Sequence, residues 1–295
     1  MTGLSGESWS LVAALAWAGA VLLNKRAGDT IPPVALNLFK NTISLGLLFL
    51  TLPLAGESIR WPDDPAGFAL LLTSGVLGVA VADTVAFRSL NLLGASRSAI
   101  VDCLYAPFVV TFSALLLDER LTWLSGVGAL GIGAGIVVAG LDRRGAAGPT
   151  RSLVEGAVLG ALAMALMAIA IVLVKPVLAT QSVLVATTWR MLAGTVSLAA
   201  ATLAVPSWRH AARAVFTPNP AWRFALPASV LGAYLALIAW MAGTKYTQAM
   251  TASILNQTST LFVVVLAAIF LREPLTRRKA AAVALGFAGS VLVLI

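Results

Sequence analysis

Ten long apolar stretches run through the chain, and short segments rich in proline, glycine or charge separate them. Each stretch is close to the ~20 residues with which an α-helix crosses the hydrocarbon core of a membrane. The pattern therefore predicts an all-α polytopic membrane protein with ten transmembrane helices. We place these helices at residues 8–25, 33–52, 66–88, 95–116, 121–141, 153–177, 183–204, 222–244, 249–270 and 275–295.

The last two helices of the first half recur in the second half without a gap. Residues 95–141 and 249–295, at an offset of 154, each contain an apolar span, a charged turn with glutamate, and a second apolar span. Self-similarity at a fixed offset is the signature of a duplicated unit. We therefore divide the chain into one five-helix repeat at residues 1–145 and another at 146–295.

The earlier helices correspond more weakly, at an offset of 150 that aligns Lys25 with Lys175 and Lys40 with Arg190. Because five helices per repeat is an odd number, the second repeat must cross the membrane in the opposite sense to the first. Two inverted repeats of this kind commonly place a solute site where the copies meet.

The composition supports the membrane interpretation and removes several functional classes. The chain is 59% hydrophobic and 11% charged, whereas a soluble domain carries roughly 25% charged residues. The net charge of +8 is scattered between apolar spans, so it predicts membrane topology and no nucleic-acid partner. The single cysteine, Cys103, excludes an intramolecular disulfide and a cysteine-cluster metal site.

Loop charges give one indication of orientation. Positive residues concentrate in the loops after helices 1, 3, 5, 7 and 9, and the other loops carry several acidic residues. Positive loops tend to stay in the cytoplasm. The charge pattern therefore predicts that both termini face away from the cytoplasm.

Two carboxylates lie inside predicted spans, Asp83 in the third and Asp102 near the start of the fourth. An ionisable group at this depth needs a partner, a water-filled cavity or a route to the interface. Two interpretations stay open for each carboxylate. It either binds a proton or cation and couples transport, or it forms a structural ion pair, for instance with Arg88 or Arg97.

A polar face surrounds Asp102, because Ser98 and Tyr105 are one helical turn away on either side. The ninth span carries five consecutive polar residues at 256–260, and its Asn256 is the repeat mate of Asp102. Five such residues cannot all face lipid, so we predict a cavity shared by the two helices. The substrate-binding candidates on these helices are Asp102, Tyr105, Asn256, Gln257 and Ser259.

Two cations also lie within spans. The second span presents a polar stripe over residues 37–44 that contains Lys40, and Arg190 is the repeat mate of Lys40 in the seventh span. Both suit the binding of a substrate anion or dipole, and the alternative is a cation that snorkels to the interface. Trp17 and Trp240 lie within spans and suit either a cavity wall or an apolar core.

Glycines concentrate in the last span of each repeat, at Gly128, Gly131, Gly135, Gly286 and Gly289. They suit close helix packing, either within one chain or in a homodimer through the fifth and tenth helices.

The turns before these spans carry Glu119 and Glu273. We predict structural roles for both, because the N–H groups and the dipole at the start of a helix favour a carboxylate.

The repeated unit, an apolar span followed by Glu, Leu-Thr and a glycine-rich final span, resembles the EamA-type unit of the drug/metabolite transporter superfamily. Residues 115–123 with 134–141 and residues 269–278 with 288–295 carry the resemblance. It implies a ten-helix carrier with a central cavity, bordered chiefly by the first, third, fourth, sixth, eighth and ninth helices. The resemblance also implies cytoplasmic termini, so it disagrees with the loop charges. Leu261 replaces a proline that the second copy is expected to carry, which puts a symmetric bend of the ninth helix in doubt.

These observations predict a secondary transporter in the bacterial inner membrane that exports a small polar metabolite such as an amino acid, coupled to protons or by exchange. The alternatives are an exporter of cationic drugs and a non-transporting scaffold. The chain carries no P-loop and no HExxH motif, and its one histidine, His210, falls in a predicted loop. We therefore predict no enzymatic activity, no cofactor and no metal.

Overall fold

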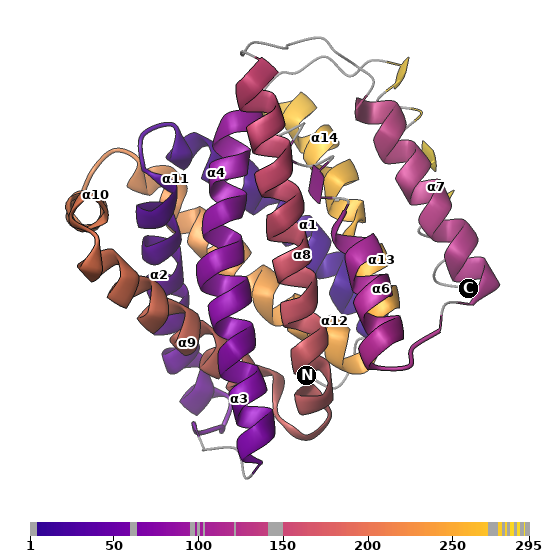
Figure 1. Cartoon of the computed structure of the whole chain (residues 1–295), viewed down its shortest axis with the longest axis horizontal. Helices are drawn as coiled ribbons and strands as arrows, with labels where there is room; N and C mark the ends of the chain where they lie inside the picture. The colour runs from indigo at the N-terminus through magenta and orange to yellow at the C-terminus, as the bar shows by residue number, and fades with distance from the viewer. Residues whose placement is uncertain are drawn as a thin grey trace.

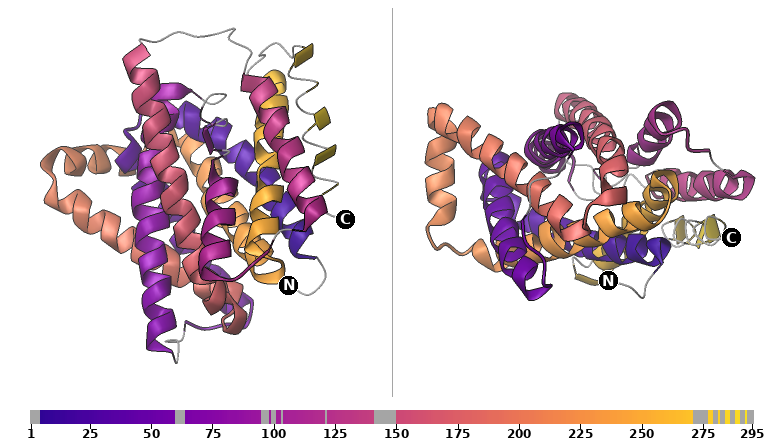
Figure 2. Two further views of the ribbon diagram at one scale, coloured as in Figure 1. Left: turned by 45° about the vertical axis from the view of Figure 1, so that its right-hand side comes forward. Right: turned by 90° about the horizontal axis from the view of Figure 1, so that it is seen from below.

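A computed structural model describes residues 5–59, 64–94, 98, 101–102, 104–120, 122–140 and 150–270, and the single or paired residues 277–278, 281, 284–285, 288–289 and 292. Every regular element within these residues is a helix (Figures 1 and 2). In the first half the helices are α1 (Gly6–Gly28), α2 (Pro33–Leu54), α3 (Pro65–Ser74), η1 (Gly75–Ala82), α4 (Asp83–Leu93), α6 (Tyr105–Leu116) and α7 (Trp123–Gly140).

The second half follows a similar order, with the additional element α10 between its second and third spans. Its helices are α8 (Thr150–Thr180), α9 (Val183–Ala204), α10 (Pro206–Phe216), α11 (Trp222–Ala228), η2 (Ser229–Ala236), α12 (Leu237–Tyr246), α13 (Ala249–Asn256) and α14 (Thr258–Phe270). The expected tenth span lies mostly outside the described residues.

One predicted loop is in fact a helix. Residues 207–220 were expected to be a break containing His210, but most of this segment forms α10. Ala212 and Val215 are buried on one face of α10, whereas Arg209 and Arg213 are exposed on the other. The segment is therefore an amphipathic helix that packs on α2 and α9 and projects from the side of the bundle (Figure 1).

Local sequence signals explain where several helices begin and end. Ser5 and Ser182 cap the first turns of α1 and α9, and Asp64 accepts hydrogen bonds from the N–H groups of Ala66 and Gly67 at the start of α3. The last turn of α4 ends at Gly94, whose φ of 77° is accessible to glycine without strain.

The two repeats are inverted in space. Figure 1 shows that α1 runs away from the end of the bundle that carries the N-terminus, whereas α8 runs toward that end. The contacts repeat as well. A Cβ at Gly6 would lie 2.6 Å from the backbone nitrogen of Thr247, and a Cβ at Gly156 would lie 2.8 Å from Cγ of Leu93. Gly156 and Leu93 are the equivalents of Gly6 and Thr247 at the offsets of 150 and 154, so α4 meets α8 as α12 meets α1.

Each repeat contains a π-helix at the same place. The elements η1 and η2 lie within the third and eighth spans and begin at Gly75 and Ser229, which are 154 residues apart. A π-helical turn is wider than an α-helical turn and is frequent at functional sites. The duplication therefore extends to a local backbone distortion.

The outer surface is apolar, as a lipid-facing surface requires. Leu54 is 87% exposed, Trp123 84% and Leu130 75%, so large hydrophobic side chains point away from the bundle. Among the described residues, six helices are long and apolar enough to cross a membrane, including the continuous span Pro65–Leu93. The chain is an all-α polytopic membrane protein.

One glycine of α7, Gly131, packs within the chain, whereas a Cβ at Gly126 or Gly133 would meet nothing within 4 Å. A Cβ at Gly131 would lie 3.2 Å from Cα of Gly289, so at this position the close approach predicted from the glycine pattern is intramolecular. A homodimer through these helices stays a prediction.

Glu119 has a structural contact, although its helix differs from the one we predicted. Its Oε1 accepts from the N–H of Ala249 at 3.0 Å and its Oε2 from the N–H of Met250 at 3.1 Å. It therefore caps α13, whose own Gln248 supplies no side-chain cap, and not the helix that follows it in sequence. Glu273, its repeat mate, lies outside the described residues.

We expect Glu119→Gln to lower the free energy of unfolding by about 1–2 kcal/mol, because the amide NH₂ would face an N–H donor of α13. Folded yield should fall more than the transport rate of the folded fraction. Asp118→Asn, which removes an exposed carboxylate of the same turn, is the matched control for thermal unfolding in detergent. Normal folded yield with abolished transport would contradict a structural role.

Candidate functional site

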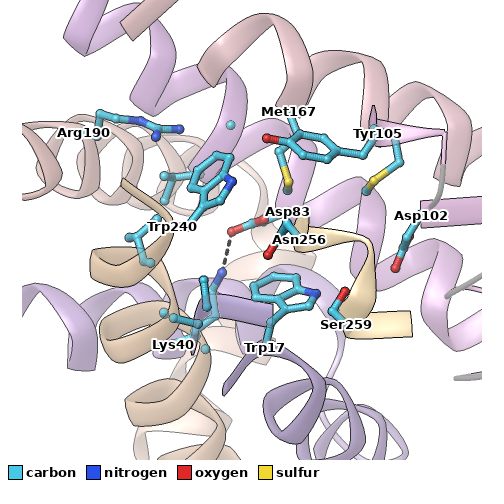
Figure 3. Close-up of a pocket in the computed structure, with 18 of the residues that line it drawn as sticks. Trp17, Lys40, Asp83, Asp102, Tyr105, Met167, Arg190, Trp240, Asn256 and Ser259 are labelled. Carbon is cyan, nitrogen blue, oxygen red and sulfur yellow. Dashed lines mark hydrogen bonds and ion pairs between the residues drawn. The ribbon is translucent and has the colours of Figure 1, made fainter. Parts of the chain in front are cut away.

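A cavity of about 100 Å³ lies between the two halves of the chain (Figure 3). Elements of both repeats line it, whereas the described residues of α7 do not. All ten candidate residues that the sequence suggested line this one cavity. They are Trp17, Lys40, Asp83, Asp102, Tyr105, Arg190, Trp240, Asn256, Gln257 and Ser259.

Asp83 is held in an ion pair with Lys40. Both side chains are largely buried, with exposed fractions of 13% for Asp83 and 4% for Lys40. The partner therefore differs from the examples we considered, because Arg88 pairs instead with Glu155 on the exposed side of α4, at 2.5 Å. Arg97, the other example, lies outside the described residues. Lys40 also lies 5.2 Å from the ring centroid of Phe87, so its ammonium stays in the protein interior and does not snorkel to the interface.

The rest of the polar stripe on α2 supports the two π-helices. The Asn37 amide donates to the backbone oxygens of Val79 at 2.9 Å and Ala80 at 3.3 Å, both in η1. Ser44 donates to the backbone oxygen of Ala233 in η2 at 2.5 Å. A backbone distortion leaves carbonyl groups that must find partners in an apolar environment. The stripe thus holds the distorted backbones that form part of the cavity wall.

Arg190 presents its guanidinium to the cavity without a carboxylate. It is 2% exposed, its Nη1 lies 3.0 Å from the sulfur of Met241, and its Nε has no hydrogen-bond partner. The guanidinium carbon lies 5.3 Å from the ring of Trp240. The three ion pairs found in the described part of the chain do not include Arg190. Burial again contradicts the snorkelling alternative.

The fourth and ninth helices meet at the other end of the cavity. The Gln257 amide donates to the backbone oxygen of Asp102 at 3.4 Å, which joins two segments at pseudo-equivalent positions. The ninth helix breaks here without a proline: α13 ends at Asn256 and α14 starts at Thr258. The Thr258 hydroxyl donates to the backbone oxygen of Leu255 at 2.7 Å, so a polar side chain at the break satisfies one backbone carbonyl. Figure 3 shows Arg190 and Asp102 at opposite ends of the drawn pocket.

The walls between these ends are aromatic and methionine-rich. The rings of Tyr105 and Trp240 lie 6.2 Å apart between centroids, and Trp17 also lines the cavity. Sequence reasoning missed Met164 and Met167 of α8, because an isolated methionine in an apolar span carries no pattern. It also missed eight further wall residues, all of them small or apolar: Ala13, Gly78, Val79, Met191, Gly232, Ala233, Ala236 and Leu237. The repeat offered one signal among them, because Gly78 and Gly232 match at the offset of 154.

Comparison with known proteins agrees with this architecture. No curated protein matches the chain. One solved chain, described only as a crystal structure of a protein, superposes with a TM-score of 0.79 at 22% sequence identity, over 97% of this chain and 95% of that chain. At this identity the likeness shows the fold alone. The model of the EamA-like transporter family matches twice, over residues 4–141 and 154–295. The chain therefore belongs to the EamA-like transporter family, and it is a multi-pass membrane transporter of small molecules.

Proposed function

We propose that the protein is a secondary transporter that exports a small polar metabolite, such as an amino acid, across the bacterial inner membrane by alternating access. The observation that carries the proposal is the cavity between inverted repeats, with a buried cation at one end and a carboxylate at the other. Inverted repeats allow the two halves to exchange roles around a fixed central site. Aromatic and methionine side chains offer apolar surface for the remainder of the substrate.

An exporter of purely cationic compounds has less support. A cation would need an uncompensated carboxylate, and Asp83 is already bonded to Lys40. Asp102 then remains as a partner, but Arg190 would repel the same ligand.

The test is a two-step measurement on purified protein. A thermal-shift screen against amino acids and related metabolites identifies compounds that bind the native state, because such ligands raise its stability. Counterflow of each labelled hit is then measured in proteoliposomes. If compounds bind but none of them shows counterflow, the result contradicts transport and favours a scaffold.

We further propose that Asp83 or Asp102 carries the coupling proton. Protonation of Asp83 would remove one charge of its ion pair and free Lys40 to interact with substrate or backbone. Transport in proteoliposomes should then respond to an imposed pH gradient, and Asp83→Asn or Asp102→Asn should lose that response. If the wild-type rate does not change with the pH gradient and both variants transport at the wild-type rate, neither carboxylate carries a coupling proton. The mechanism is then substrate exchange without protons.

A further inference from the structure

The two repeats carry equivalent cations but not equivalent carboxylates. Lys40 and Arg190 correspond at the offset of 150, and the partner of Lys40 is Asp83. At the offset of 154 the position of Asp83 corresponds to Leu237, which also lines the cavity. The second repeat therefore keeps the cation and lacks the acid.

The surroundings of Lys40 and Arg190 also correspond, so the two cations occupy structurally equivalent positions. Lys40 lies over the ring of Phe87, and Arg190 contacts Met241, which is the equivalent of Phe87 at the offset of 154. A Cβ at Gly78 would lie 2.9 Å from Nη2 of Arg190, so the guanidinium rests against the backbone of η1. The guanidinium therefore lies between η1 and Met241 of α12.

The hydrogen bonds of Arg190 are incomplete. A guanidinium has five N–H donors in a planar fork and is always charged. Here one nitrogen contacts a thioether sulfur, which is a weak acceptor, and Nε has no partner. No carboxylate bonds the guanidinium directly, and the Asp83 carboxylate, which also acts on it, is bonded to Lys40. A buried charge that is paired this incompletely is costly, so the arrangement favours an anion that can enter the cavity.

We propose that Arg190 binds an anionic group of the transported substrate, a carboxylate or phosphate, and that Leu237 in place of an acid keeps the guanidinium available for it. The proposal rests on the proposed transport function and narrows its substrate class. Arg190 suits the two oxygens of such a group because its fork donates two parallel hydrogen bonds. Trp240, which lies against the guanidinium, would pack on the remainder of the substrate.

The experiment supplies the missing acid and asks whether it displaces the anion. Leu237→Asp should pair with Arg190 as Asp83 pairs with Lys40, while Leu237→Asn makes the same change of shape without the charge. The probes are the sodium salts of acetate, benzoate, phosphate and sulfate, and each amino acid beside its amide, which lacks the carboxylate. Binding is measured by thermal shift and titration calorimetry, against sodium chloride at equal ionic strength.

We expect carboxylate- or phosphate-bearing probes to stabilise the wild type, and the amides to do so much less. Leu237→Asp should weaken that binding by at least about tenfold relative to Leu237→Asn, the ratio expected for one lost charge-assisted hydrogen bond. Arg190→Met should abolish it and keeps the test decisive if Leu237→Asp does not fold. Arg223→Gln, which removes an exposed arginine outside the cavity, is the control and should bind like wild type.

The proposal is overturned if no anion of the panel stabilises the wild type, or if Leu237→Asp binds anions as well as Leu237→Asn does. Failure of the transport function has a different signature. A protein that binds carboxylates through Arg190 but gives no counterflow would refute transport and leave the anion site in place. Transport of a compound without an anionic group, at equal rates in wild type and Leu237→Asp, would refute the anion site and leave transport in place.

Discussion

Lys40→Met should lower the free energy of unfolding by about 3–5 kcal/mol, because it leaves the Asp83 carboxylate buried without its partner. The two side chains are almost fully enclosed and bond directly to each other. Methionine keeps most of the volume of the lysine stem, so the loss reports the missing charge and not a cavity. Thermal or denaturant-induced unfolding of the purified protein in detergent would measure it.

The double variant Lys40→Met/Asp83→Leu should recover most of that stability, because replacing both members of a buried ion pair by apolar residues is often neutral. Lys25→Met is the matched control, since it removes a lysine whose partner Asp29 is 49% exposed, and exposed pairs contribute about 0–1 kcal/mol. If Lys40→Met were as stable as wild type, Asp83 would not carry a charge in the folded protein. The assignment of an ion pair between Lys40 and Asp83 would then be wrong.

The global architecture could be predicted because it leaves a direct trace in the sequence. Span lengths give the number of helices, and the ungapped match around Glu119 and Glu273 gives the repeat. An odd number of helices per repeat then requires inversion. The helix that Glu119 caps could not be predicted, because α13 lies 130 residues further along the chain than Glu119 and the contact exists only in the packed bundle.

The candidate cavity could be located because polar residues in apolar spans are costly unless they face each other. Every residue chosen on that ground lines the same cavity. What each one does there was not predictable from its type. Lys40 and Arg190 look alike in sequence, yet one is bonded to a carboxylate and the other is not. The difference lies in the residue at position 83 or 237, on another helix.

The π-helices were not predicted, and the reason is physical. Hydrophobic periodicity reveals helical pitch only where polar and apolar faces alternate. Residues 75–82 have no polar side chain, and residues 229–236 have only Ser229 and Tyr234. The sequence contains only an indirect sign of the π-helices. Asn37 on the second span bonds the carbonyls of η1, so an amide in a lipid-depth helix marked a distortion in its neighbour.

Gly194→Ala should lower the free energy of unfolding by about 1–3 kcal/mol through overpacking. A Cβ at this position of α9 would lie 2.6 Å from Cβ of Val79 and 2.8 Å from the backbone oxygen of Gly75. Neither atom is the end of a flexible side chain, so η1 itself would have to move away from α9. That movement would also shift Gly78, which lies against the guanidinium of Arg190.

Gly46→Ala is the matched control and should change stability in the opposite direction. Gly46 lies inside α2, and a Cβ there would meet nothing within 4 Å. Alanine restricts the unfolded chain and favours the helix by roughly 0.5–1 kcal/mol relative to glycine. Thermal unfolding of both variants in the same detergent measures the difference. Equal effects of the two substitutions would mean that α9 and η1 are not in close contact. Helix packing would then not explain why Arg190 lies against η1.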